Sequence, residues 1–273
     1  PNAQPGFEAH VATDGEVLVP SFRMGAGGDP NNHFYNPQTK AWIQKPKKDG
    51  LYNQYWNIAK NGDLFTIGDP QTIIHYKFGG LDGHDNPIWD ATNATTSVVT
   101  EFKPVRRLVY DSDADVMYMA GDVKDQNWGS FLRVKKFPEW STGNRTSTFT
   151  AELPYQDKEY AGNSNYGGAQ PASFSVAGHY IFILYGIGHV RILNKTDGSL
   201  VGTLRQNVNG WKGSDGQVDA AYAMTVTLRK NGEYVMLFEN AAWANIQMYR
   251  WCPGDVGAGA PCSQPGSHQS TVP

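Results

Sequence analysis

The chain has 273 residues and carries 23 Lys and Arg against 26 Asp and Glu, a formal net charge of −3. This near balance argues against nucleic acid as a partner, because nucleic-acid binding needs clustered positive charge. Charged residues make up only 18% and aromatic residues 12% of the chain, which argues against disorder. No apolar run approaches the ~20 residues of a membrane-spanning helix, so we expect no membrane span.

In chain order, the sequence predicts a repeated pair of apolar strands joined by a tight polar turn. These hairpins are expected over residues 7–22, 55–68, 107–121, 171–186 and 223–240. Their turns include Asn61-Gly62 and Asn231-Gly232, residue types that reach the positive φ required by a two-residue turn. A second, more polar hairpin is expected after each, around residues 33–44, 79–96, 138–148, 189–204 and 245–251.

Two hairpins that repeat every roughly 47 to 64 residues are typical of the four-stranded blades of a β-propeller. The runs at 116–120 and 180–185 are almost wholly apolar, as expected for strands buried on both faces. We therefore predict an all-β β-propeller over residues 1–251, with about five visible blades that could belong to a six- or seven-bladed ring. A β-sandwich is the alternative, although its strands do not normally repeat as paired hairpins. Residues 252–273 are expected to form a Cys/Gly/Pro/Ser-rich tail or linker.

Two cysteines and three glycosylation motifs bear on the compartment. Cys252 and Cys262 lie in Gly- and Pro-rich sequence, and their spacing suits a small disulfide loop, which needs an oxidising compartment. Two free thiols are the alternative. Asn93, Asn144 and Asn194 each begin an acceptor sequence for N-linked glycans. Because the chain does not begin with Met, we interpret it as a processed chain or a piece of a longer one, and predict an extracellular, secreted protein.

Three stretches carry a resemblance to a known family. They are Gly80-Leu-Asp-Gly-His-Asp-Asn-Pro-Ile-Trp89, the hairpin over residues 107–121, and Asn231-Gly-Glu-Tyr234 followed by Met248-Tyr-Arg-Trp251. The repeats resemble the NHL-like and related six-bladed propellers of secreted bacterial proteins. Such propellers serve as lyases, sugar oxidoreductases, ligand binders and scaffolds, so the resemblance implies a fold rather than one function.

The candidate binding site lies in the long loops. In a propeller, the loops between second and third strands and the connections between blades emerge on one face, around the channel. Aromatic rings beside amides suit a sugar, because rings stack on its C–H face while polar groups bind its hydroxyls. The alternative is that the rings fill gaps between blades. The aromatic candidates are Trp128, Trp211, Trp243, Tyr160 and Tyr166.

The charged candidates are Asp69, Asp122, Glu239, Arg106 and Arg107. The three acids follow or end second strands, and carboxylates repeated at a channel mouth could bind calcium. They could also act as an acid/base pair if their pKa values diverge. The alternative is that they cap loop amides or pair with the two arginines. No metal-ligand set and no catalytic constellation stands out, and calcium is the one cofactor that these residues suggest.

We favour a secreted recognition or scaffold module that binds a glycan or another extracellular polymer at the channel face. One alternative is a carbohydrate-active enzyme, either a lyase or hydrolase or a quinone-dependent sugar dehydrogenase, which needs the charged candidates to converge on one substrate. Another is a subunit of an extracellular assembly, in which unpaired blade edges join neighbouring chains. The sequence leaves open whether the protein is an enzyme.

Overall fold

The computed structural model describes residues 8–12, 17–22, 33–36, 41–44, 54–69, 71–84, 86–122, 131–154, 171–186, 188–204, 221–240, 246–253 and 268–271. The chain divides into two compact units, Pro1–Glu152 and Leu153–Pro273. Nearly all regular structure in the described residues is β-strand, with one short 3-10 turn at Trp140–Thr142. Within these residues, no helix is long and apolar enough to cross a membrane.

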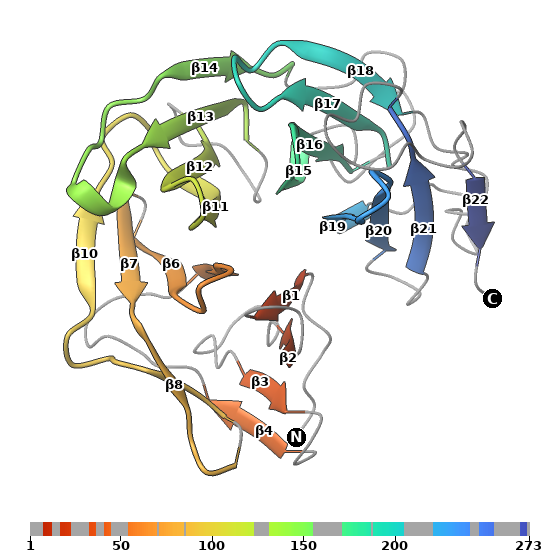
Figure 1. The fold of residues 1–273 in the computed structure, drawn as a ribbon. Coiled ribbons are helices and arrows are strands. Elements are labelled where there is room, and N and C mark those ends of the chain that lie inside the picture. Colours follow the sequence, from red (N-terminus) through yellow and green to blue (C-terminus); the bar gives the residue numbers. More distant parts are fainter. Residues whose placement is uncertain are drawn as a thin grey trace, which may run out of the picture. The chain divides into compact units, whose positions relative to one another are not determined.

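The first unit holds three four-stranded antiparallel sheets (Figure 1). The first consists of β1 (Glu8–Ala12), β2 (Val17–Phe22), β3 (His33–Asn36) and β4 (Ala41–Gln44). The second consists of β5 (Gln54–Ile58), β6 (Leu64–Asp69), β7 (Thr72–Tyr76) and β10 (Thr95–Val98). The third consists of β11 (Val105–Asp111), β12 (Val116–Gly121), β13 (Arg133–Pro138) and β14 (Phe149–Glu152). In each, neighbours in the chain pair side by side, apart from an insertion before β10.

The second unit holds two more sheets of the same kind. The fourth consists of β15 (Pro171–Ala177), β16 (Tyr180–Tyr185), β17 (Val190–Asn194) and β18 (Leu200–Leu204). The fifth consists of β19 (Ala221–Leu228), β20 (Tyr234–Asn240), β21 (Ile246–Trp251) and β22 (His268–Thr271). The five first hairpins predicted from the sequence are therefore all present, as β1–β2, β5–β6, β11–β12, β15–β16 and β19–β20.

Two outer strands differ from the expected pattern. In the second sheet, the third strand is β7, and a two-stranded ribbon of β8 (Phe78–Leu81) and β9 (Pro87–Trp89) is inserted before β10. In the fifth sheet, β22 pairs with β21, with His268 opposite Arg250. This strand lies inside the segment 252–273 that was expected to be a tail. The segment therefore supplies an outer strand, which its polar sequence without apolar periodicity did not indicate.

The second strand forms the core of the third and fourth sheets. Every residue of β12 and of β16 is buried, because these strands have packed residues on both faces. First strands of successive sheets lie side by side within each unit: β11 contacts β5, and β19 contacts β15. The backbone N–H of Tyr110 donates to Asn57 Oδ1 at 2.9 Å, and that of Val226 donates to Ser175 Oγ at 3.2 Å. The same contact thus recurs between equivalent strands in both units, as expected for repeated blades.

Candidate functional site

Each sheet has two ends that differ in character. We call the end where the second strand leads to the third the loop end, and the opposite end, where the first and second strands are joined, the turn end. Because strands alternate in direction, the connection between third and fourth strands also lies at the turn end. The sequence placed the candidate site at the loop ends. In the third sheet, Arg106 and Arg107 at the start of β11 and Asp122 directly after β12 lie at that end.

Asp122 ties the loop end of the third sheet together. Its side chain is 1% exposed, and Oδ1 accepts a hydrogen bond from the Leu132 N–H at 2.9 Å. Its own N–H donates to the Pro104 carbonyl at 2.9 Å, and its carbonyl accepts from the Lys103 N–H. The segment that enters β11 and the segment that enters β13 are therefore both held against one residue.

The electrostatics of Asp122 follow from its burial. Arg106 Nε lies 3.8 Å from Oδ2, which is an ion pair but longer than a hydrogen bond. Burial raises the pKa of Asp122 to about 6, against the opposing effects of the Leu132 N–H and Arg106. A carboxyl with this pKa exchanges its proton near neutrality, which is the property of an acid/base group. The contacts of Asp122, however, are those of a residue that caps a loop amide and pairs with Arg106. This is the alternative role that the sequence analysis left open.

The other charged candidates are only partly described. Asp69 is the last residue of β6, and Glu239 is the next-to-last residue of β20. The backbone therefore places both residues at the ends of second strands, a position equivalent to that of Asp122 in the third sheet. The side chains of Asp69 and Glu239 lie outside the described part of the chain. Arg107 donates from Nη1 to the Arg106 carbonyl at 2.8 Å.

The aromatic candidates Trp128, Trp211, Trp243, Tyr160 and Tyr166 lie outside the described residues. Their convergence at one face therefore stays a prediction. Among the described residues, no group of three or more His, Cys, Asp or Glu could hold a metal ion. The calcium site suggested by the sequence likewise stays a prediction.

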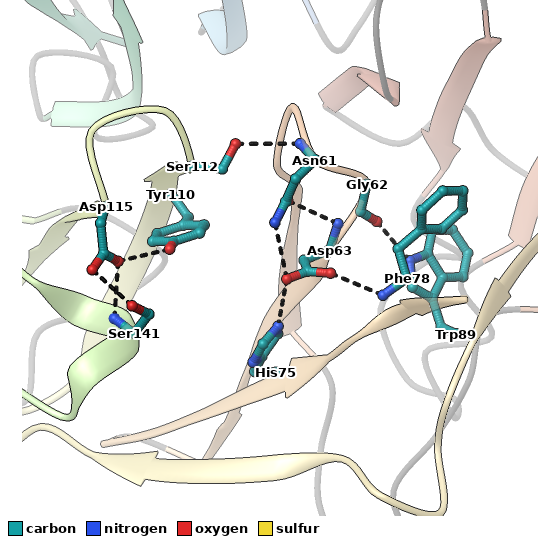
Figure 2. A network of polar contacts seen from close by, with 10 residues as sticks. All are labelled: Asn61, Gly62, Asp63, His75, Phe78, Trp89, Tyr110, Ser112, Asp115 and Ser141. Carbon is teal, nitrogen blue, oxygen red and sulfur yellow. Dashed lines mark hydrogen bonds and ion pairs between the residues drawn. The ribbon is translucent and has the colours of Figure 1, made fainter. Parts of the chain in front are cut away.

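The turn ends carry a network that the sequence analysis did not identify (Figure 2). Asp63, between β5 and β6, accepts from the Phe78 N–H through Oδ1 at 2.9 Å, and its Oδ2 lies 2.9 Å from Nε2 of His75 on β7. The His75 ring stacks on Phe65 with centroids 4.4 Å apart. Burial alone would raise the pKa of Asp63, but these hydrogen bonds outweigh it and the pKa is lowered. One half-buried carboxylate thus fixes the hairpin turn to the next two strands.

Asp115 holds the same place in the third sheet. Oδ1 accepts from the Tyr110 hydroxyl at 2.7 Å and from the Ser141 N–H at 2.9 Å, while Oδ2 accepts from the Ser141 hydroxyl at 2.8 Å. In the fifth sheet, Glu233 pairs with Arg229 at 3.1 Å and with Arg250 of β21. Each acid directly precedes a second strand and binds a group on or beside the third. Their shared role is to hold the outer hairpin against the inner one.

A sequence signal for this network exists. The residue before the second strand is Glu16, Asp63, Asp115 and Glu233 in four repeats and His179 in the fourth sheet. The acidic position is visible once the repeats are aligned on their second strands. The partners of this acid differ in residue type and in position from one repeat to the next, so the sequence does not reveal them.

Comparisons with known proteins agree with this architecture. No protein-family profile matches the chain, and no curated protein matches it. Among solved structures, the WD40 repeats of RRP9 align over 90% of this chain at 9% identity with a TM-score of 0.51. The β-propeller domain of Myceliophteria_thermophila Cps50 (Swd1) aligns over 99% of this chain at 10% identity with a TM-score of 0.51. The structure of U3-55K aligns over 90% of this chain at 8% identity with a TM-score of 0.50.

These matches establish the class of fold. The chain is a β-propeller with four-stranded antiparallel blades, which confirms the predicted fold class. The alignments cover 61%, 72% and 62% of the three matched chains, so the chain matches less than two thirds of the length of two of them. The matched structures are WD40 repeats and propellers, and the resemblance to the NHL-like propellers of secreted bacterial proteins stays a prediction.

Proposed function

We propose that this β-propeller is a recognition or scaffold module that binds an extracellular polymer, with a glycan as the favoured ligand, at the loop ends of its blades. The observation that carries this is the anchoring by Asp122. Leu132 donates its N–H to Asp122 Oδ1, so the two residues that flank positions 123–131 are hydrogen-bonded to each other. A loop with fixed ends loses less conformational entropy on binding, which favours recognition. Trp128 lies within this segment.

The proposed location is extracellular. Cys252, half-buried after β21, is not a free thiol. Cys262 lies outside the described residues, and we propose it as the partner in a disulfide. The residues proposed for the ligand are the aromatic candidates together with Arg106, Arg107 and Asp122, with Asp69 and Glu239 at the matching places of their own sheets.

The test is binding to an array of defined neutral and acidic oligosaccharides. We expect Trp128→Ala or Trp211→Ala to weaken binding by about tenfold, since stacking of a ring on a sugar contributes roughly 1–1.5 kcal/mol. Leu81→Ala is a matched control, because Leu81 is an exposed apolar side chain on the β8–β9 ribbon. Unchanged affinity in both Trp variants would remove the glycan proposal.

An enzyme acting on carbohydrate is the second candidate, and the raised pKa of Asp122 favours it. In this role, Asp122 would transfer a proton at the substrate. Mass spectrometry of the same oligosaccharides after incubation with the protein separates the candidates. Cleavage or oxidation that disappears in Asp122→Asn supports the enzyme, whereas binding without turnover in the parent protein contradicts it.

A further inference from the structure

The three Asn-X-Thr sequences share one place in the fold. Asn93 lies between β9 and β10, Asn144 lies between β13 and β14, and Asn194 is the last residue of β17, just before the turn to β18. All three therefore fall between the third and fourth strands of the second, third and fourth sheets. Each lies at the turn end of its own sheet, opposite the loop end that is proposed to bind ligand.

Two of the three asparagines have the same hydrogen-bonding arrangement. Asn144 Oδ1 accepts from the Thr146 N–H at 2.9 Å, and Asn194 Oδ1 accepts from the Thr196 N–H at 2.8 Å. Both threonines are exposed. The carboxamide is thus held through its oxygen, in an Asx turn. Within the part of the chain that the structure describes, Nδ2 of neither asparagine donates to a protein acceptor, so this nitrogen is left to solvent.

Asn93 is arranged differently. Its Nδ2 donates to Asp90 Oδ2 at 2.7 Å, and its backbone N–H donates to Asp90 Oδ1 at 2.9 Å (Asp90 directly follows β9). These two bonds lower the pKa of Asp90, so the acceptor is an anion at neutral pH. Hydrogen bonds to a charged acceptor are the stronger kind. Asn93 is exposed whereas Asn144 and Asn194 are half-buried. Exposure alone therefore predicts that Asn93 is the most reactive of the three, whereas hydrogen bonding of Nδ2 predicts that it is the least reactive.

We infer that Asn144 and Asn194 are the N-glycan acceptors of the folded protein and that Asn93 is a poor one. In the transfer, Nδ2 forms a bond to the anomeric carbon of an oligosaccharide carried on a polyprenyl diphosphate. The bond from that carbon to the diphosphate oxygen breaks, the lipid diphosphate leaves, and Nδ2 gives up one proton. At Asn93, the nitrogen must first be released from the Asp90 carboxylate. This inference rests on the secreted location in the proposed function.

Glycans at these two positions have a structural consequence. They would cover the turn ends of the third and fourth sheets and leave the loop ends uncovered. Modification and ligand binding are therefore compatible on the same blade.

The experiment uses the full chain, produced unglycosylated in a bacterial periplasm and verified as folded by circular dichroism. The protein is incubated with a purified single-subunit oligosaccharyltransferase and a lipid-linked oligosaccharide, and site occupancy is followed over time by peptide mass spectrometry. We expect Asn144 and Asn194 to be modified and Asn93 to react roughly tenfold more slowly, the factor for losing one charge-assisted bond. Thr146→Ala and Thr196→Ala should each abolish modification at one site.

Asp90→Ala is the decisive variant and should bring the Asn93 rate close to that of the other two. Asp197→Ala is its matched control, because Asp197 accepts from Ser199 rather than from Asn194, and it should leave the Asn194 rate unchanged. Modification of Asn93 as fast as the others in the parent protein, no response to Asp90→Ala, or no modification at any site would each overturn the inference. Occupancy is measured without polymer ligand, so a failed glycan-array experiment leaves the occupancy result unaffected. A failed occupancy experiment likewise leaves the result of the glycan array unaffected.

Discussion

Replacing Asp122 by Asn should stabilise the protein at neutral pH, which is unusual for a buried, hydrogen-bonded residue. Asn keeps a carbonyl oxygen for the Leu132 N–H and carries no charge. The carboxylate that it replaces is 1% exposed, and the Leu132 N–H and the 3.8 Å contact with Arg106 do not fully offset its burial. The substitution therefore removes a poorly compensated charge while keeping the loop cap.

The size of the effect follows from the pKa of Asp122, which burial raises from 3.8 to about 6. One pKa unit corresponds to about 1.36 kcal/mol, so ionising this group destabilises the folded state by up to about 3 kcal/mol. The folded carboxyl holds its proton to a higher pH than the unfolded one. Stability from this group is therefore greatest below about pH 4, falls as the pH rises through about 6, and is level above pH 7. The gain from Asp122→Asn should be near zero at pH 4 and reach its full value above pH 7.

The assay is urea unfolding at several pH values between 4 and 8, with hydrogen exchange of β12 peptides to report on the third sheet itself. Carboxylates whose pKa is lowered, such as Asp115, stabilise the fold with the opposite pH dependence. They are common to both proteins, so the difference between parent and variant isolates Asp122. The reasoning would be refuted if Asp122→Asn were less stable than the parent at pH 8, or if the difference did not change with pH.

Two further predictions concern the turn ends. Gly178→Ala should lower the free energy of unfolding by about 1–3 kcal/mol in thermal unfolding, because φ of Gly178 is +53° and an added Cβ would lie 2.2 Å from Tyr234 Oη. Gly202 has open space around it, so Gly202→Ala should be nearly neutral. Equal effects of the two substitutions would contradict this prediction. Asp63→Asn should cost about 1–2 kcal/mol at pH 7. Because the pKa of Asp63 is lowered from its ordinary 3.8 in the fold, its contribution is lost as the pH falls below that value. Parent and variant should therefore converge in acid, and a difference that stays constant would contradict the His75 contact.

Local patterns in the sequence determined the hairpins. Asn61-Gly62 is a turn dipeptide, and Gly62 has φ of +87°, a value that disfavours residues with a Cβ. The run that became β12 is apolar at nearly every position and is buried throughout. Such features depend on residues close together in the chain, which is why strand positions and the blade repeat were predicted. In the fourth sheet, Ala177 pairs with Tyr180 and leaves Gly178-His179 as the turn.

Features that depend on distant residues were not predicted. The polar strand β22 forms because β21 offers it hydrogen-bonding partners, and its own sequence carries no apolar alternation. The sequence allowed Asp122 to be a ligand, an acid or a cap, and only its burial beside Leu132 and Arg106 set its contacts and its pKa.

The sequence by itself thus determined the repeated hairpins, because strand alternation and turn chemistry are encoded within a few neighbouring residues. The tertiary structure decided which polar groups meet across strands: Asp63 with His75, and Asp115 with Ser141. These pairings set charge and hydrogen bonding. They depend on strand register and on how the outer strands fold back, which no local pattern of residues specifies.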